Sequence, residues 1–495
     1  MPADPRVVII GAGITGGCIA RELSRYHLDV HLIEREGDVG WGTTKANTGI
    51  IHPGHEEDAT RHPLRAMLCR QGNEHWRRWT QELDIPARWP GELMVAHDTT
   101  ERETLEHYHQ LGKHNHVDGL RIVEGEEMQK LEPLLHDDIV AALWAPSAGI
   151  IAPWEAVLGV VENAQANGVQ IHLDSEVVDM EIDGDTVTGL QTSQEHIAAD
   201  VVINAAGLYA GHVAKMAGIH EPALTPRRGE YILFDEDSDV QPERIVHPVP
   251  TEHTKGVYAV TTIEGNLMLG PTAEDLPPDA IHDRATTREG ISSIWDNAAR
   301  LLRRLPSRQA VVKTFAGLRP EPPHGRYVIQ AYDNPWGFIN AAGIRSPGLT
   351  AAPAIAAYIA GLLHTQLDIE LQEKQNWQPR RHRIPRLASL PQEQQQHRIQ
   401  QQPAYGRVVC RCKEVTEAEI IEAIQRIRRL GGTVSLDGVK FRTLAMFGFC
   451  QGSFCRTHIA RIIARELDMP LWKVTERGTA AYVTGDVKSL QEDQP

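Results

Sequence analysis

The first 34 residues alternate between short apolar runs and glycine in the order expected for a strand, a turn, a helix and a second strand. Val7–Ile10 is an apolar run of strand length, and the glycine-rich stretch Gly11–Gly16 (GAGITG) follows it directly. Gly17–Arg25 suits a helix, and Asp29–Glu34 (DVHLIE) reads as the next strand. The pattern predicts a βαβ unit at the start of the chain.

Apolar runs of both kinds continue to about residue 365. We expect strands over Asp200–Asn204, Tyr231–Phe234 and Leu267–Leu269. We expect helices over Arg65–Leu83, Trp154–Asn167 and Ala352–Leu363. This mixture predicts an α/β unit with a second, interleaved sheet domain.

The pattern changes after His364. Residues 366–403 are Gln-rich, basic and punctuated by proline, with too little apolar content for a core, so we expect a linker or an arm lying on the first domain. A small, mainly helical module is expected over 404–470, before a tail at 471–495. Its first helix should begin at the capping box Thr416–Glu419, and a second should cover His458–Leu467.

Composition and charge exclude several classes of protein. The 495 residues are 41% apolar and 23% charged, which is typical of folded domains and argues against wholesale disorder. The net charge of −16 argues against a nucleic-acid partner. No run approaches 18 apolar residues and no basic segment precedes the first strand, so we expect no transmembrane segment and no secretory signal. A cytoplasmic protein, with peripheral attachment to the inner membrane left open, is the default.

The glycines of the first turn have the spacing of a dinucleotide-binding fingerprint. Gly11, Gly13 and Gly16 give G-x-G-x-x-G between a strand and a helix, where backbone amides can approach a pyrophosphate. Glu34 ends the next strand, where a carboxylate can accept a hydrogen bond from a ribose hydroxyl. A purely steric glycine turn is the alternative. The fingerprint does not distinguish FAD from NAD.

Four of the six cysteines fall in the C-terminal module, whereas Cys18 and Cys69 stand alone. The four are arranged as C-x-C and C-x4-C pairs, a spacing that fits neither structural zinc sites nor the common ferredoxins: Cys410, Cys412, Cys450 and Cys455. An iron–sulfur cluster, a zinc ion and unligated core cysteines all remain open on spacing alone. A cluster would favour FAD, because flavin can release electrons one at a time.

The sequence resembles two known families. Residues 1–365 resemble D-amino-acid-oxidase-type FAD oxidoreductases, particularly the anaerobic glycerol-3-phosphate dehydrogenase A-subunit branch. The motifs that carry this resemblance are GAGITG (11–16), GTTKANTGIIHPG (42–54), VINAAGLYA (202–210), RRGEYILF (227–234), GLRPEP (317–322) and NAAGIRSPGLTAAPAIA (340–356). The C-terminal part resembles the bacterioferritin-associated-ferredoxin-like (BFD-like) [2Fe-2S] domain through VVCRCKEVTEAEI (408–420) and KFRTLAMFGFCQGSFC (440–455).

The resemblance implies a fold and a domain organisation. The expected fold class is α/β (α+β): a Rossmann-like FAD-binding domain, an interleaved antiparallel-sheet substrate domain and a small, mainly helical [2Fe-2S] domain. The FAD-binding parts would cover about 1–90, 150–215 and 325–365, and the substrate parts about 91–149 and 216–324. The four cysteines of the module would hold the [2Fe-2S] cluster.

The resemblance also implies positions along FAD. Glu34 and Arg35 would hold the adenosine end, and Thr43 and Thr44 would lie along the pyrophosphate. The other positions would approach the cofactor from a returning strand or lie near the isoalloxazine: Ala205, Gly207, Gly343, Leu349 and Thr350. Each of these could instead be an ordinary turn or helix cap.

Three residues are candidates for the chemistry itself. His52 matches the family histidine close to flavin and substrate, and Arg319 matches an arginine that binds the anionic group of the substrate. Arg345 departs from the uncharged or acidic residue common before SPGLT. It would either point inward and join Arg319 on one anion, or point to solvent or pair with an acid. A guanidinium suits both phosphate and carboxylate.

The resulting prediction is an FAD-dependent dehydrogenase of a small anionic 2-hydroxy compound, foremost sn-glycerol 3-phosphate. Electrons would leave through the [2Fe-2S] cluster to a quinone or an acceptor protein, with additional subunits left open. An L-2-hydroxyglutarate dehydrogenase and an amino-acid or amine dehydrogenase are alternatives of the same class. An electron-transfer subunit of a larger complex, without a substrate of its own, is the alternative of another class.

Overall fold

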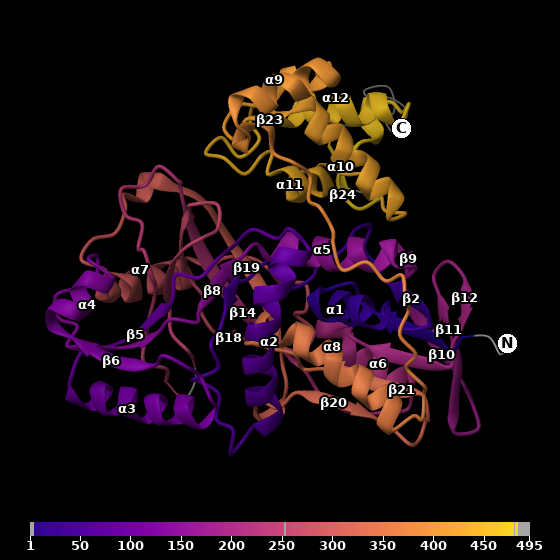
Figure 1. The fold of residues 1–495 in the computed structure, drawn as a ribbon, viewed down its shortest axis with the longest axis horizontal. Coiled ribbons are helices and arrows are strands. Elements are labelled where there is room, and N and C mark those ends of the chain that lie inside the picture. The colour runs from indigo at the N-terminus through magenta and orange to yellow at the C-terminus, as the bar shows by residue number, and fades with distance from the viewer. Residues whose placement is uncertain (1–3, 252–253, 480, 484–495) are drawn as a thin grey trace, which may run out of the picture.

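The computed structural model describes residues 4–251, 254–479 and 481–483. Two sheet-centred units lie side by side, and the helical C-terminal module sits above them (Figure 1). Each of the three parts has its own apolar core. This arrangement agrees with the fold class predicted from the sequence, while the domain boundaries themselves stay a prediction.

A six-stranded sheet forms the centre of the first unit. Its order is β20–β21–β13–β1–β2–β9, and only β20 runs antiparallel to its neighbour. The strands are β20 (Val328–Ala331), β21 (Phe338–Ala342), β13 (Val201–Asn204), β1 (Arg6–Ile10), β2 (Asp29–Ile33) and β9 (Gln170–His172). The strands β1, β2, β13 and β21 are short apolar runs buried almost throughout, as is typical of a parallel sheet covered on both faces.

Helices pack around this sheet: α1 (Ile14–Leu23), α2 (Pro63–Glu82), α5 (Pro153–Ala166), α6 (Ala210–Met216) and α8 (Gly348–Thr365). The sequence predicted α1, α2, α5 and α8, whose observed bounds differ from the expected ones by up to four residues. By length and composition α8 could cross a bilayer, but 67% of it is buried, and it packs against α1 and α2. A core helix has the same composition.

A nine-stranded, mostly antiparallel sheet forms the centre of the second unit. Eight strands follow the order β18–β14–β17–β16–β15–β5–β7–β6, and β19 pairs with β14. The strands are β18 (Glu274–Asp275), β14 (Thr225–Phe234), β17 (Leu267–Gly270), β16 (Tyr258–Thr261), β15 (Ile245–Pro248), β5 (Glu92–Ala96), β7 (Ala141–Ala145), β6 (Arg121–Glu124) and β19 (Val311–Glu321). Three helices belong to this unit: α3 (Thr99–His114), α4 (Gly125–Leu131) and α7 (Arg288–Leu301).

Two small sheets complete the body. One has the order β3–β8–β4 and contains β3 (Ile50–Ile51), β8 (Gly149–Ile151) and β4 (Ala87–Arg88). The other forms the edge of the molecule at the right of Figure 1 and contains β10 (Val177–Asp183), β11 (Thr186–Thr192) and β12 (His196–Ala198). After β2 the chain returns to the first sheet three times, for β9, for β13 and for β20 with β21, so β1, β13 and β21 lie side by side although they are far apart in sequence.

Residues 366–383 lie along the first unit, whereas the segment packs on the C-terminal module from Ile384 onward. Arg381 enters a buried ion-pair cluster, with Nη1 2.6 Å from Glu155 and Nε 2.7 Å from Glu162. The indole of Trp377 donates to the hydroxyl of Ser24 at 3.1 Å. The Gln-rich stretch also forms a helix, α9 (Gln392–Gln401), which the sequence did not predict because it lacks a clear apolar face.

The C-terminal module contains three further helices and two hairpins. They are α10 (Glu417–Arg429), α11 (Leu436–Thr443), α12 (Arg456–Glu466), β22 (Val408–Cys410), β23 (Val415–Thr416), β24 (Thr475–Arg477) and β25 (Ala481–Tyr482). The predicted capping box is present, with the Thr416 hydroxyl and the Glu419 carboxylate each accepting from the other's backbone N–H. Residues 484–495 of the predicted tail lie outside the described residues.

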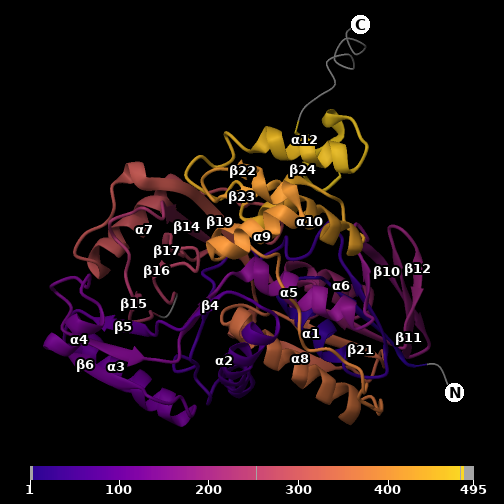
Figure 2. The same cartoon turned by 45° about the horizontal axis from the view of Figure 1, so that its top comes forward.

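A buried ion pair joins the C-terminal module to the first unit, which contains the glycine fingerprint. The guanidinium of Arg442 on α11 donates to both carboxylate oxygens of Asp38, at 2.5 and 2.8 Å, and both side chains are only 2% exposed. Asp38 lies in the loop after β2, and the neighbouring carbonyl of Gly37 accepts from the N–H of Thr433 at 3.0 Å. Figure 2 shows the module seated over α5 and this side of the first sheet.

We expect Asp38→Asn to loosen the module. A buried guanidinium that loses its anionic partner typically costs about 3–5 kcal/mol, because the remaining charge stays desolvated. The measurement is the rate of limited proteolysis within 366–403 of the full-length protein, which should rise by at least tenfold. Asp437→Asn is the control, since its one salt bridge within the described part of the chain, with Lys45, is 4.0 Å long. Equal cleavage of wild type and Asp38→Asn would show that the pair does not hold the module.

Candidate functional site

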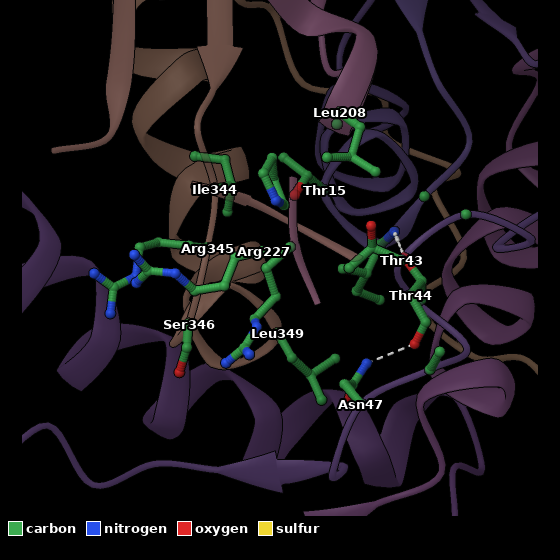
Figure 3. Close-up of a pocket in the computed structure, with 18 of the residues that line it drawn as sticks. Thr15, Thr43, Thr44, Asn47, Leu208, Arg227, Ile344, Arg345, Ser346 and Leu349 are labelled. Atoms are coloured by element: carbon green, nitrogen blue, oxygen red, sulfur yellow. Dashed lines mark hydrogen bonds between the residues drawn. The ribbon is translucent and has the colours of Figure 1, made fainter. Parts of the chain in front are cut away.

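A continuous pocket runs from the β1–α1 turn to the nine-stranded sheet. Figure 3 shows Thr43, Thr44 and Asn47 on one side of it and Arg227, Arg345 and Ser346 on the other. Its walls therefore come from the 42–50 segment, from β14 and from the turn before α8. The carboxyl ends of β1 and β13 open into it, which is where open α/β sheets bind ligands.

The fingerprint glycines make a cradle that only glycine permits. Gly11 has φ +102°, and a Cβ there would lie 2.6 Å from the carbonyl oxygen of Ala205. A Cβ on Gly16 would lie 1.9 Å from the carbonyl oxygen of Gly11, so α1 and β1 pack at backbone distance. Gly11 and Gly13 line the pocket, whereas Gly16 lies behind them. The turn thus presents bare backbone to a ligand, which fits a dinucleotide pyrophosphate.

Glu34 and Arg35 line the pocket at its end beside the β1–α1 turn. The Glu34 carboxylate accepts from the N–H of Ala12 at 2.9 Å and from that of Glu36 at 3.0 Å, and burial raises its pKa. The guanidinium of Arg35 stacks 3.8 Å over the ring of Tyr209. Two backbone donors fix the carboxylate at the position where the fingerprint requires an acceptor.

Thr43 and Thr44 also line the pocket, but their hydroxyls already have partners. The Thr44 hydroxyl accepts from the N–H of Ile14, the first residue of α1, at 3.0 Å. The Thr43 hydroxyl donates to the carbonyl of Leu318 on β19 at 2.6 Å. These bonds hold the 42–47 segment between the helix and the second sheet.

Of the other predicted cofactor positions, Ala205, Gly207 and Leu349 line the pocket. Gly343 and Thr350 do not. A Cβ on Gly343 would lie 2.8 Å from Pro322, and its φ of +65° explains the glycine by backbone conformation. Thr350 is fully buried, and its hydroxyl accepts from the N–H of His52 at 2.9 Å. Both positions therefore support the pocket wall from behind.

His52 follows β3 and lines the pocket beside Tyr258, with ring centroids 6.2 Å apart. Its carbonyl accepts from the amide of Asn73 at 3.1 Å, so the backbone is fixed on both sides. Its Nδ1 is buried, with no hydrogen-bond partner among the described residues. Burial, and secondarily the charge of Lys255, lowers the pKa of His52 to about 3. The imidazole is therefore neutral and able to accept a proton.

The sequence did not point to the charged cluster beside His52. Lys255 lines the pocket and contacts Glu56 and also Glu57, the latter at 3.1 Å. Burial alone would lower the pKa of Lys255, but the two carboxylates raise it above its ordinary value. The Tyr258 hydroxyl donates to Glu56 at 3.4 Å. Lys255 has no motif around it; the only sequence signal was the pair of acids four and five positions after His52.

Arg319 on β19 lines the pocket with an incompletely partnered guanidinium. One terminal nitrogen donates to the carbonyls of Thr272, at 2.6 Å, and Arg228, at 3.3 Å. Its Nε is buried without a hydrogen-bond partner, and no salt bridge to Arg319 is found in the described part of the chain. Burial lowers its pKa. A half-buried cation without a salt-bridge partner, beside a pocket, favours an anionic ligand.

Arg345 combines two of the possibilities that the sequence left open. It lines the pocket, and its Nη1 lies 3.0 Å from a carboxylate oxygen of Glu321. Arg227, from the RRGEY motif, also lines the pocket and lies 3.3 Å from the other oxygen of Glu321. Glu321 therefore offsets part of the charge of both arginines through salt bridges, whereas it acts on Arg319 without forming a salt bridge to it in the described part of the chain.

The four cysteines of the module come together as two pairs. The Sγ atoms of Cys412 and Cys450 are 3.5 Å apart. The thiols of Cys410 and Cys455 interact with each other, which lowers the pKa of Cys410 to about 6. Gly448 lies against this group, because a Cβ there would be 2.3 Å from the Cβ of Cys412. Thiolate character at the first position suits a metal ligand.

The paired arrangement fits two metal ions better than one. Within residues 4–251, 254–479 and 481–483, no three Cys, His, Asp or Glu side chains gather around a single point. A structural zinc ion needs four donors at one centre, whereas a [2Fe-2S] cluster divides four thiolates between two irons. The donor set therefore fits the cluster that the motifs predicted.

Cys450→Ser is expected to remove the iron and leave FAD bound. The fingerprint turn and the cysteines belong to parts of the chain that have separate hydrophobic cores. Losing one thiolate therefore does not disturb the glycine turn that binds the cofactor. Iron and FAD analysis of anaerobically purified protein should change from two irons and one FAD per chain to FAD alone. Cys18→Ser is the control, because Cys18 is buried in α1 far along the chain from the module. Stoichiometric zinc without iron in the wild type would contradict the assignment.

Two family models match the chain. Residues 6–362 match the FAD dependent oxidoreductase family, and residues 408–465 match the BFD-like [2Fe-2S] binding domain. Together they cover both parts of the chain that carry the fingerprint and the cysteine pairs.

Known proteins resemble the chain over different lengths. A glycerol 3-phosphate dehydrogenase of Caloramator mitchellensis is 38% identical over 98% of this chain and 99% of its own length. The structure of an FAD-bound L-α-glycerophosphate oxidase from Mycoplasma pneumoniae is 31% identical, with a TM-score of 0.71 over 77% of this chain and 98% of that one. The human mitochondrial L-2-hydroxyglutarate dehydrogenase is 28% identical over 54% of this chain and 60% of its own.

Proposed function

Since the chain belongs to the FAD-dependent oxidoreductase family, with a BFD-like [2Fe-2S]-binding domain at its C-terminal end, we propose that it is a glycerol-3-phosphate dehydrogenase. It oxidises sn-glycerol 3-phosphate to dihydroxyacetone phosphate and passes the electrons through its cluster to an acceptor. The match to a glycerol 3-phosphate dehydrogenase over nearly the whole of both chains supports this substrate. FAD and the [2Fe-2S] cluster are its cofactors.

The observation that carries the proposal is the state of Arg319. Its guanidinium is half-buried, with Nε fully buried and unpartnered and no carboxylate partner among the described residues, and such a charge is costly unless a ligand supplies the anion. The phosphate of the substrate would accept from Arg319, with Arg345 and Arg227 on the same side of the pocket. A dianionic phosphate suits several guanidinium groups better than the single carboxylate of a neutral amino acid does.

We assign His52 the role of the base that removes the proton of the substrate hydroxyl. FAD, when bound, accepts the hydride from the hydroxyl-bearing carbon. The neutral imidazole of His52 takes the hydroxyl proton, which is the task of a general base. Thr350 and Asn73 hold the backbone of His52 in place, and burial, with the positive charge of Lys255 second, lowers the pKa of His52 and keeps the ring unprotonated before substrate arrives.

The C-terminal module gives the electrons a way out that the flavin pocket alone does not offer. Oxidation of the alcohol releases two electrons, whereas the cluster carries one at a time. A quinone or an electron-transfer protein would be the final acceptor. If electrons leave through the cluster, we expect artificial one-electron acceptors to be reduced faster than oxygen.

The test is anaerobic bleaching of the flavin by sn-glycerol 3-phosphate, L-2-hydroxyglutarate and amino acids, each added alone to the holoenzyme. Glycerol 3-phosphate should bleach the flavin fastest. Faster bleaching by L-2-hydroxyglutarate would show that the protein is an L-2-hydroxyglutarate dehydrogenase. No bleaching by any substrate would favour an electron-transfer subunit. Peroxide formed as fast as dye is reduced would make it an oxidase.

A further inference from the structure

Three exposed apolar side chains lie within two residues of a cysteine of the module in the sequence. Phe449 and Phe454, which directly precede Cys450 and Cys455, are 68% and 45% exposed. Val408, two residues before Cys410, is 54% exposed. Exposed apolar groups that gather in one region mark interaction sites more often than single ones do. We call these three residues, with the charged groups described below, the outer face.

The opposite side of the cysteine group is already occupied. Phe447, next to Gly448, packs on Trp154 at the start of α5, with ring centroids 5.2 Å apart. Phe441 contacts both of these rings, and the Lys45 ammonium lies 5.2 Å over it. Lys45 belongs to the same 42–47 segment whose neighbours line the flavin pocket. The inner side therefore adjoins the flavin unit, while the outer face is open to solvent.

The outer face is basic on a protein whose net charge is −16. The Arg411 guanidinium stacks 4.6 Å over the ring of Phe454, and His458 packs on the same ring at 5.5 Å. Arg461 follows His458 by three residues on α12, which puts it on the same helical stripe. Within the described part of the chain neither Arg411 nor Arg461 forms a salt bridge, whereas Arg407 and Arg456 pair with Glu417 and Glu476.

We propose that the outer face is the docking surface for an acidic one-electron redox protein. This inference rests on the proposed function, because it names the partner that receives the electrons. Aromatic and arginine side chains are the residue types that dominate protein interfaces, and here Phe449, Phe454 and Arg411 are the immediate sequence neighbours of the cysteines. The positive charge of the arginines would steer an acidic partner to the module that holds the partly exposed Cys412 and Cys450.

Charge and size favour a protein over a membrane surface. An anionic bilayer meets a whole side of the molecule, and the excess of 16 negative charges opposes that approach. A small acidic patch on a protein meets only the local charge, because salt screens interactions beyond about 8 Å. Glu414 is the exposed acid in the loop that carries Arg411 and Cys412, so the basic character of the face depends mainly on Arg411 and Arg461.

The transfer at this face balances simply. One electron leaves the module, oxidising one ferrous iron to ferric, and one ferric iron of the partner becomes ferrous. Two such transfers remove the two electrons released when one alcohol becomes one ketone, and two protons pass to solvent. No further oxidant or co-reactant is required.

Binding to oxidised rubredoxin, a small acidic iron protein, tests the proposal without turnover. We expect the oxidised holoenzyme to bind rubredoxin with an affinity that falls as salt rises, and to bind basic cytochrome c at least tenfold more weakly. Arg411→Glu, Arg461→Glu and Phe449→Ser should each weaken rubredoxin binding at least tenfold. The matched controls, Arg300→Glu on α7 and Val178→Ser on β10, replace exposed side chains elsewhere and should change it less than twofold.

Each variant is to be compared at equal iron and FAD content, so that loss of the cluster cannot imitate loss of docking. Rubredoxin binding that is absent, or unaffected by all three substitutions, would overturn the proposal. Cosedimentation with phosphatidylglycerol vesicles that is lost in the same variants would assign the face to a membrane instead. Dye-linked oxidation of glycerol 3-phosphate does not use the outer face, so its failure would count against the proposed function alone.

Discussion

Arg319→Leu is expected to lower kcat/KM for sn-glycerol 3-phosphate by roughly 10²- to 10³-fold. Leucine removes a half-buried cation that lines the pocket and has no carboxylate partner among the described residues, and a buried anion without its counter-charge costs about 3–5 kcal/mol. The measurement is dye-linked steady-state kinetics of the FAD-loaded protein. Bleaching by dithionite should be unchanged, which separates lost substrate binding from a damaged flavin site.

Two further arginine variants sharpen this test. Arg319→Lys keeps the charge but loses the planar fork, so it should recover only part of the activity. Arg345→Gln should cost less than tenfold, because Glu321 already offsets the charge of Arg345 at 3.0 Å. If Arg345→Gln is as damaging as Arg319→Leu, the anion is held mainly at Arg345 and our ordering of the two is wrong.

His52→Gln is expected to slow flavin reduction by glycerol 3-phosphate by roughly 10²-fold, the lower end of the contribution of a general base. Glutamine keeps a polar side chain near Tyr258 but cannot take the hydroxyl proton. Stopped-flow bleaching at saturating substrate measures the step directly. A variant reduced as fast as the wild type would make His52 a structural residue.

The pH profile gives an independent check on His52. Burial lowers its pKa to about 3 in the folded protein, so the imidazole is neutral throughout pH 5–8 and should produce no step in the flavin-reduction rate there. The unfolded histidine takes up its proton near pH 6.5. The contribution of His52 to stability is therefore present above that pH and is lost as the pH falls towards 3. A step near pH 6.5 that vanishes in His52→Gln would contradict the lowered pKa.

The fold was readable from the sequence wherever local pattern and tertiary packing agree. The buried strands β1 and β13 are unbroken apolar runs, and Thr416 and Glu419 form the predicted capping box. The comparisons confirm the family, the fold class, FAD and the [2Fe-2S] cluster. Helix α9 was missed because its Gln-rich sequence has no apolar stripe and it is held by neighbouring segments.

The site was only partly readable, since it is assembled from distant segments. Glu34 and the fingerprint glycines belong to one local unit, whose geometry the spacing fixes. Lys255 reaches His52 across 203 positions of sequence, so no local pattern announces it. Gly343 and Thr350 were expected beside the cofactor, but they lie behind the pocket wall, where a turn and a hydrogen bond to His52 account for them.

The roles of the individual residues stay predictions, and Arg345 illustrates why. The sequence allowed it to face the pocket or to pair with an acid, and the fold lets it do both through Glu321. Whether Arg345 faces the pocket or pairs with an acid depends on the contact between β19 and the turn before α8. Residue type and spacing do not determine that contact.

The most direct test of the account is an anaerobic titration of the holoenzyme with sn-glycerol 3-phosphate, followed by flavin absorbance and electron paramagnetic resonance. We predict that the flavin bleaches and that the signal of a reduced [2Fe-2S] cluster appears in the same sample, without any added protein. Cys450→Ser should show the bleaching without the signal. An unbleached flavin, or a bleached flavin beside a cluster that stays oxidised in the wild type, would contradict the proposed path of electrons from substrate to cluster.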